Sequence, residues 1–386
     1  MPTPSKFPPR YLLLDSWRGL ACVLVALHHA GFLIQMSEAE GSSWESTLQG
    51  WAVALYRRMD VGVPLFFVIS GYCIAASLDA HRVKRASPWR FLGRRFWRIY
   101  PPYWAAVACF IAAVAGLNGA GWKPMSVGVH SLHLDSPEEL TRAQWLGNLT
   151  LTETWRHPVL GGDDSKNLTR ISWTLCFEEQ FYFLSFVLLL LAPRRLFEAL
   201  GVATALILAW SLAAYDAGWF HQLSGIFPEL WYQFAVGLAV YWRLVRADSK
   251  QARRSVDAAL FALALAGWVQ GAAGVRDVGL FGLALIALRP FDATLADSRI
   301  LSPLRACGRR CYSIYLIHLP VCVVAAEAAV QLGCTGFWPR ALLAAPLVGS
   351  LGVGAGWLFY AAVESRFWSR SNPKILAADE TRMGHG

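Results

Sequence analysis

The sequence predicts an all-α polytopic membrane protein, a bundle of about ten transmembrane helices. Of its 386 residues 55% are hydrophobic and only 16% charged, and the mean hydropathy is +0.38. A soluble protein of this length carries about a quarter charged residues. The apolar residues are grouped in blocks that approach the roughly 17–25 residues needed to cross a bilayer. Most positive charges lie between these blocks, as they do in loops that connect membrane spans.

Ten apolar segments are interpreted as spans, and the eighth is the shortest of them. A strongly basic loop, 81–98, follows the second span, and a long loop, 119–172, follows the third. Long loops are commonly functional, so we expect specificity for a ligand to lie in 119–172. The predicted spans are 11–36, 61–80, 99–118, 173–192, 197–214, 229–245, 256–273, 278–290, 311–330 and 341–363.

The distribution of Lys and Arg predicts that both chain ends are cytoplasmic. If the N-terminus is inside, 25 of the 35 Lys and Arg residues fall in inner segments and nine in outer segments, and the remaining one is Arg18. Cytoplasmic loops collect positive charge. The first span is expected to be retained, because Arg18 interrupts it and no small-residue cleavage signal follows. The predicted regions are a cytoplasmic tail 1–10, a membrane domain 11–365 with its periplasmic loop at about 119–172, and a cytoplasmic tail 366–386.

Composition also argues against two other classes of protein. The net charge of +9 comes from loops between spans, so it reports membrane topology rather than nucleic-acid binding. The eight cysteines fall mostly inside apolar segments and form no C-x-x-C pair. Neither a disulfide framework nor a metal site is therefore predicted.

The first span, LDSWRGLACVLVALHHA, contains ionisable residues where apolar ones are expected. A charged group in hydrocarbon costs about 2.5–3.5 kcal/mol on insertion scales, so such residues are functional candidates. Arg18 and His29 are eleven residues apart, which places them on one helix face about 16 Å apart. Asp15 is close enough to pair with Arg18. The alternative is that Arg18 extends to the inner surface and that the histidines, His28 above all, are packing residues.

Two charged motifs occur near other spans. Arg95 and Arg98, at the end of the basic loop, suit a phosphate-bearing cytoplasmic ligand, but on these residues alone topogenic charge and attraction to anionic lipid are the favoured explanation. Glu178 and Glu179 enter the fourth span and point about 100° apart, so at most one faces a given partner. A buried carboxylate needs a partner or a proton. We therefore expect one of them to pair with His29, and the alternative is a structural ion pair.

Two further polar residues are interpreted mainly as packing residues. Ser70 lies beside Gly71 in the second span, where small residues serve close helix contact. Ser70 is also a candidate nucleophile, but the G-x-S-x-G motif is absent. His318 lies in the ninth span, two turns from its predicted inner end, where packing or a cytoplasmic-side contact competes with a catalytic role.

Five sequence motifs follow one another along the chain: LDSWRGLACVLVALHHA, VGVPLFFVISGYCI, RRFWRIYPPYW, SWTLCFEEQFYFL and YSIYLIHLPV. In this order they resemble the acyltransferase-3 family of integral membrane O-acyltransferases. Relative to the common family pattern, Ser16 and Trp17 replace Gly and Leu, and Pro64 stands where some relatives have an acid. The chain is expected to be a stand-alone member, without a C-terminal esterase-like domain. The family's Arg-x10-His pair corresponds to Arg18 and His29, its R-x-x-R element to Arg95 and Arg98, and its glutamate motif to Glu178 and Glu179.

The resemblance implies an enzyme of the bacterial inner membrane. It would move an acyl group, often acetyl, from cytoplasmic acyl-CoA to a hydroxyl of a sugar, surface polysaccharide, lipid-linked glycan or small glycoside. Acyl-CoA is then a co-substrate and no cofactor stays bound, while membrane lipid surrounds the chain. We expect His29 to act as base and one glutamate to orient His29 or the acceptor. The alternative is a transporter or sensor that uses the same Arg, His and Glu as a relay, and the oligomeric state is open.

Overall fold

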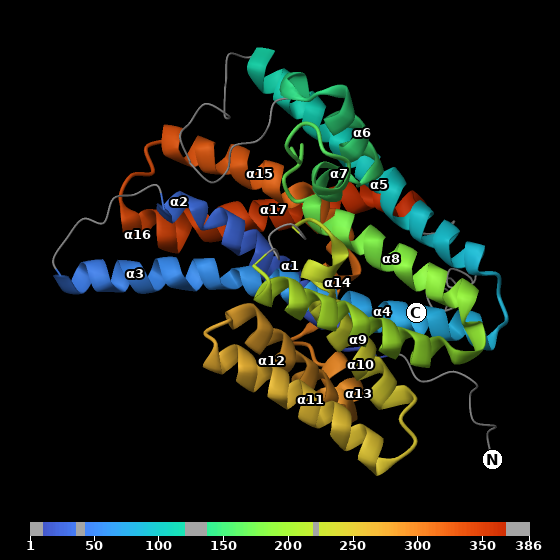
Figure 1. Ribbon diagram of the computed structural model, residues 1–386. Helices are drawn as coiled ribbons and strands as arrows, with labels where there is room; N and C mark the ends of the chain where they lie inside the picture. Colours follow the sequence, from blue (N-terminus) through green and yellow to red (C-terminus); the bar gives the residue numbers. More distant parts are fainter. Residues whose placement is uncertain (1–10, 36–42, 120–136, 219–223, 368–386) are drawn as a thin grey trace, which may run out of the picture.

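The computed structural model describes residues 11–35, 43–119, 137–218 and 224–367. Within these ranges all regular structure is helical (Figure 1), which confirms the all-α prediction. The predicted N-terminal tail, most of the C-terminal tail and residues 120–136 of the long loop lie outside the described residues. The first nine α-helices are α1 (Leu14–Ala30), α2 (Phe32–Gln35), α3 (Ser43–Arg58), α4 (Gly62–Val83), α5 (Pro88–Gly119), α6 (Arg142–Thr150), α7 (Glu153–Leu160), α8 (Trp173–Leu191) and α9 (Leu196–Asp216).

The second half of the chain is helical in the same way, and π-helical turns at Arg340–Ala344 and Tyr360–Glu364 flank the last α-helix. Short 3-10 turns connect several of the longer helices. The remaining α-helices are α10 (Trp231–Val245), α11 (Lys250–Val269), α12 (Ala273–Leu288), α13 (Asp292–Ala296), α14 (Ser302–Arg309), α15 (Cys311–Gln331), α16 (Phe337–Pro339) and α17 (Ala345–Phe359).

Within the described ranges, eight helical stretches are long and apolar enough to cross a membrane. Helices α10 and α11 stand where the sixth and seventh spans are predicted, but α10 has only 15 residues and α11 begins with charged side chains. The count of ten and the orientation stay predictions. The surfaces of the long helices expose large apolar side chains, as expected of helices that face lipid. Examples are Phe183, Leu191, Leu206, Leu212, Leu347 and Leu358.

The structure has helix where the sequence analysis places loop. Residues 43–58 form α3, which continues through a short turn into α4 and runs beside α2 and α16 in Figure 1. Its Trp44 and Trp51 side chains are 66% and 71% exposed. Helix α5 begins at Pro88, so Arg95 and Arg98 lie on a helix, one turn apart. The apolar pattern marks only the part of each helix that is buried or in lipid, which explains why the helices extend beyond the predicted spans.

Glycines let two pairs of helices meet at backbone distance. A Cβ on Gly19 of α1 would lie 1.7 Å from the carbonyl oxygen of Leu304, and Gly308 of α14 makes the reciprocal contact with Asp15. Gly71 of α4 is pressed in the same way against Phe234 of α10, as predicted for a small residue beside Ser70. The contacts of Gly19 and Gly308 fix α14 on the first turns of α1.

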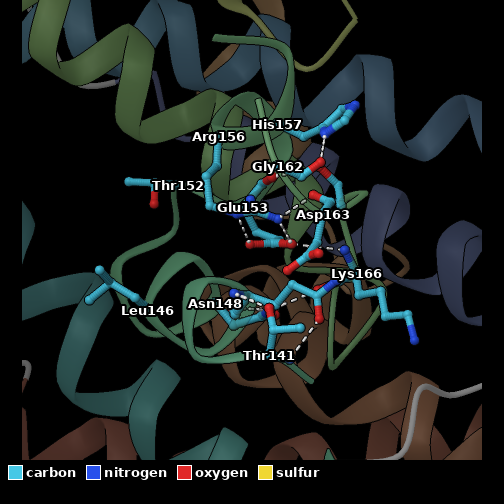
Figure 2. Close-up of polar contacts among 12 residues, drawn as sticks. Thr141, Leu146, Asn148, Thr152, Glu153, Arg156, His157, Gly162, Asp163 and Lys166 are labelled. Carbon is cyan, nitrogen blue, oxygen red and sulfur yellow. Dashed lines mark hydrogen bonds and ion pairs between the residues drawn. The ribbon is translucent and has the colours of Figure 1, made fainter. Parts of the chain in front are cut away.

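The described part of the long loop is folded around a buried ion pair (Figure 2). Glu153 of α7 is fully buried and accepts hydrogen bonds from the Arg156 side chain at 3.0 and 3.2 Å and from the Lys166 backbone N–H at 2.8 Å. Arg156 also donates to the Asp163 carbonyl at 2.8 Å. The hydrogen bond to the Glu153 carboxylate raises the pKa of the Arg156 guanidinium above its ordinary value. Asn148 of α6 binds the Lys166 carbonyl at 2.7 Å, so this network holds α6, α7 and the segment before α8 together.

Candidate functional site

Two cavities meet inside the helix bundle and share one wall. The wall consists of Val63 and Phe67 from α4, Thr174 from α8 and Tyr315 from α15. The Tyr315 hydroxyl contacts the Thr174 hydroxyl and donates to the Ile171 carbonyl at 2.6 Å. The histidine cavity, about 600 Å³, is lined among others by His28, His29, Pro64, Asn167, Arg170 and Gln233. The arginine cavity, about 180 Å³, is lined among others by Arg18, Ser70, Cys73, Arg95, Arg98 and Glu178.

In the histidine cavity, a chain of hydrogen bonds sets the tautomer of His29. Nδ1 of His318 lies 3.0 and 2.8 Å from the carbonyl oxygens of Ile314 and Tyr315. A carbonyl only accepts, so Nδ1 carries the proton and Nε2 of a neutral His318 is an acceptor. Nδ1 of His29 lies 3.1 Å from that nitrogen and 2.9 Å from the Val25 carbonyl, so it too carries a proton. Nε2 of His29 is therefore the basic nitrogen.

His318 lies two turns from the start of α15, as predicted for its span, but at the same level as His29, because α15 starts deeper in the bundle than α1. Helix α14 occupies the space beside the first turns of α1, so α15 begins deeper. The Cys22 thiol of α1 donates to the carbonyl of Cys311, the first residue of α15, at 3.5 Å. His29 and His318 each lie seven residues beyond that contact, so the two imidazoles meet, with ring centres 5.0 Å apart.

The arginine cavity gathers cationic and polar groups from five helices, α1, α4, α5, α8 and α15. Arg18 pairs with Asp15 at 3.0 Å, as predicted, and its other terminal nitrogen lies 2.8 Å from the Cys73 sulfur. Arg95 stacks on the Tyr182 ring, with 4.9 Å between the guanidinium carbon and the ring centre. Arg98 completes the cationic lining. A pocket of this composition fits a ligand with phosphate groups.

The glutamate motif serves the arginine cavity rather than the histidine. Oε1 of Glu178 accepts a hydrogen bond from the Ser70 hydroxyl at 2.7 Å and one from the Tyr182 hydroxyl. Glu179 does not line the cavity, and its Oε1 is buried without a hydrogen-bond partner among the described residues. In the described structure His29 is thus bonded to His318 and not to either glutamate. The predicted pairing of a glutamate with His29 is therefore wrong.

The remaining predicted residues are divided between the two cavities. Arg18 and His29 belong to one helix, but each lines a different cavity. His28, predicted as a packing residue, also lines the histidine cavity, and its Nδ1 lies 3.1 Å from the Tyr56 carbonyl. Sequence reasoning missed Tyr315 of the shared wall. Its position, one turn before His318 on the same helix face, was the available signal.

The described residues form no group of three or more potential metal ligands.

Comparison with known proteins was made on the whole sequence. A family model described as "Acyltransferase domain", acyltransferase family 3, matches residues 11–361. The protein named "Putative membrane-bound transacylase BcsY" of Komagataeibacter xylinus is 30% identical over 330 residues, which cover 81% of this chain and 73% of that protein. No solved structure matches. The two cavities thus lie in a chain that belongs to the acyltransferase-3 family of membrane acyltransferases.

Proposed function

We propose that this protein moves an acyl group, in the simplest case acetyl, from acyl-CoA in the arginine cavity to a hydroxyl of a carbohydrate acceptor in the histidine cavity. The observation that carries the proposal is the shared wall, which separates a cationic pocket from an imidazole with a free nitrogen by single side chains. The excess of Lys and Arg at the same end of the helices as the arginine cavity supports a cytoplasmic donor and an acceptor on the other side, in a bacterial inner membrane.

The donor half of the reaction follows from the charges. Arg18, Arg95 and Arg98 would hold the phosphate groups of CoA, since planar guanidinium groups bind phosphate oxygens in pairs. The thioester would then reach the wall formed by Phe67, Thr174 and Tyr315. Hydrogen bonds hold the two hydroxyls of this wall in place, so they would orient the thioester at the junction of the two cavities, where the acceptor oxygen can reach it from the histidine side.

The acceptor half follows from the tautomer of His29. Nε2 takes the proton of the acceptor hydroxyl while its oxygen bonds to the thioester carbon. The carbon–sulfur bond then breaks, and His29 returns the proton to the departing thiolate, so CoA leaves as a thiol. His318 holds the imidazole and stabilises the proton on Nδ1, a positioning role like that of the carboxylate in a catalytic triad.

The basic test is release of CoA thiol from acetyl-CoA by the purified protein in nanodiscs, with and without a bacterial glycan extract. Mass spectrometry of the extract identifies the product by a mass gain of one acetyl group. We expect thiol release to depend on the extract. Movement of an added glycoside across proteoliposomes without thiol release would contradict the proposal and favour a transporter.

Loss of the Arg95 or Arg98 guanidinium group is expected to weaken binding of the acyl donor selectively. Arg95→Ala and Arg98→Ala should each raise KM for acetyl-CoA by about 10- to 150-fold, since a lost charged hydrogen bond costs about 1.5–3 kcal/mol, with a smaller change in kcat. Arg94→Ala is the matched control, because Arg94 is exposed on the same helix. An unchanged KM in both variants would show that the phosphates bind elsewhere.

Removal of the Ser70 hydroxyl is expected to leave transfer nearly intact. The reaction proposed here has no acyl-enzyme, and the Ser70 hydroxyl donates to the Glu178 side chain and forms no bond to the acyl group, so Ser70→Ala should keep kcat within a few-fold. Intact-mass spectrometry after a pulse of acetyl-CoA checks the same point. A covalent acetyl group that Ser70→Ala abolishes would establish a two-step route.

Loss of the His318 nitrogens is expected to lower kcat by roughly 10- to 100-fold, because a misplaced base costs about that much. His318→Phe keeps an aromatic ring in this buried position but removes the acceptor for His29. His318→Gln offers a carbonyl oxygen in its place and should recover part of the rate. KM for acetyl-CoA should stay constant in both. Equal loss in the two variants, with both folded, would assign His318 to packing.

A further inference from the structure

A third cavity continues the histidine cavity along the long loop. It measures about 620 Å³ and shares Ser165, Asn167 and Trp173 with the histidine cavity. From there it extends between α7 and the segment that precedes α10. Each cavity alone is large enough for a small ligand, since such sites measure about 300–1,000 Å³. We call this third cavity the loop cavity. The histidine cavity and the loop cavity together form one elongated cleft, with Trp173 at their junction.

The chemistry of the loop cavity differs from that of the arginine cavity. No Lys or Arg occurs among the described residues that line it, so phosphate groups have no charged partner there. Its polar lining offers hydrogen-bond donors and acceptors beside the aromatic rings of Trp173 and Phe177. Aromatic faces combined with such groups suit a neutral polyhydroxyl ligand, which has apolar ring faces and hydroxyl edges. The polar side chains are Thr154, His157, Ser165, Asn167, Ser224 and Glu229.

Hydrogen bonds between separate segments hold the walls of the loop cavity in place. The carbonyl of Gly225 accepts from the side chains of Thr154 at 3.3 Å and Gln180 at 3.1 Å, which ties the segment before α10 to α7 and α8. The Gly225 N–H donates to Oε2 of Glu229 at 2.8 Å. Ser165 donates to the Glu153 carbonyl at 2.8 Å. The cavity is thus formed before any ligand binds, so little binding energy is needed to order it.

On the basis of the proposed acyl transfer, we infer that the acceptor is an oligosaccharide of at least two sugar units. The reacting unit lies in the histidine cavity beside His29, and the neighbouring unit lies in the loop cavity beyond Trp173. His157 and Glu229 belong to the loop cavity alone. They should therefore contribute to binding only when the second sugar unit is present. A site for a single sugar would show no such dependence on length.

The test measures affinity against chain length, without acyl-CoA, for the full chain in nanodiscs. The probes are maltose-series and N-acetylglucosamine-series oligosaccharides of one to four units. In at least one series we expect affinity to rise about tenfold between one unit and two or three units. The double variant His157→Ala, Glu229→Gln should lose this gain and keep the affinity for one unit. Glu139→Gln, an exposed loop carboxylate, should keep the gain.

Equal affinity for all lengths, or no binding of the longer members, would overturn the inference. A gain in wild type that the double variant retains would overturn the assignment to the loop cavity. Thiol release from acetyl-CoA, measured on the same preparation, tests the transfer reaction separately. A length-dependent gain without thiol release contradicts the transfer alone. The three-unit member of the binding series, with and without an octyl aglycone, compares a lipid-linked acceptor with a free one. Tighter binding of the octyl glycoside supports a lipid-linked glycan in this cleft, and equal binding supports a free glycan.

Discussion

Replacement of His29 by Ala is expected to lower the rate of acyl transfer by about 10²–10⁴-fold, the usual contribution of a positioned general base. The reason is that Nε2 of His29 is the one ring nitrogen of His29 and His318 without a hydrogen bond among the described residues. Once Nε2 is gone, the acceptor hydroxyl has no base in place. Because His29 does not line the arginine cavity, KM for acetyl-CoA should stay constant. Single-turnover transfer of labelled acetyl measures both quantities.

His28 provides the matched control for this variant. It is the neighbouring residue on the same helix, lines the same cavity, and contacts the Tyr56 carbonyl. The proposed reaction gives it no proton to move, so His28→Ala should change the rate by less than tenfold. If His29→Ala, shown to be folded and inserted, kept the wild-type rate, the base would be another group. Equal and large losses in both variants would point to a disturbed cavity instead.

The sequence was sufficient for the helices and for the spacing of Arg18 and His29 along the first of them. Apolar segments predict helices because each span must satisfy its backbone within lipid, and this holds for α1, α4 and α8. The separation of Arg18 and His29 is fixed by the helix itself, whereas the two cavities that they line are formed by the packing of several helices. The contact between Asp15 and Arg18 is local in the same sense.

The partner of His29 could not be obtained in this way, because depth was counted along each predicted span. That count places His318 far from His29, since it ignores α14. The close approach of Gly19 and Gly308 displaces the start of α15, and only packing reveals it. The glutamates were misassigned for a related reason. Helical spacing shows that Glu178 and Glu179 diverge but not which neighbour each meets, and Glu178 meets Ser70 of α4.

The loop cavity depends still more on non-local contacts. Thr154 and Gly225, which join its two sides, are distant in the sequence, and α8 and α9 lie between them. No apolar pattern marks them. The sequence indicated only that a long loop is commonly functional. The structure shows how its buried polar groups are satisfied: the buried Glu153 accepts hydrogen bonds from the Arg156 side chain and the Lys166 N–H. The loop proposed to select the acceptor is therefore held in a fixed conformation.

Replacement of Glu153 by Ala is expected to unfold this loop locally while the membrane helices remain folded. The variant leaves the Arg156 guanidinium, only 8% exposed, without its carboxylate partner, and breaking a buried ion pair costs about 3–5 kcal/mol. Hydrogen exchange measured by mass spectrometry should show lost protection over residues 142–168 and unchanged protection in α15 and α17. Glu139→Ala is the control, since its exposed ion pair with Lys166 is worth less than about 1 kcal/mol.

The functional consequence of this variant distinguishes the two sides of the enzyme. Ser165 and Asn167 line both the histidine cavity and the loop cavity, and they belong to the segment that the Glu153 carboxylate holds through the Lys166 backbone N–H. The arginine cavity takes no residue from that segment. Glu153→Ala should therefore weaken binding of the acceptor and leave acetyl-CoA binding, measured by titration, at its wild-type affinity. Parallel loss of both affinities would mean that the loop supports the whole bundle, and the separation of donor and acceptor sides argued here would be wrong.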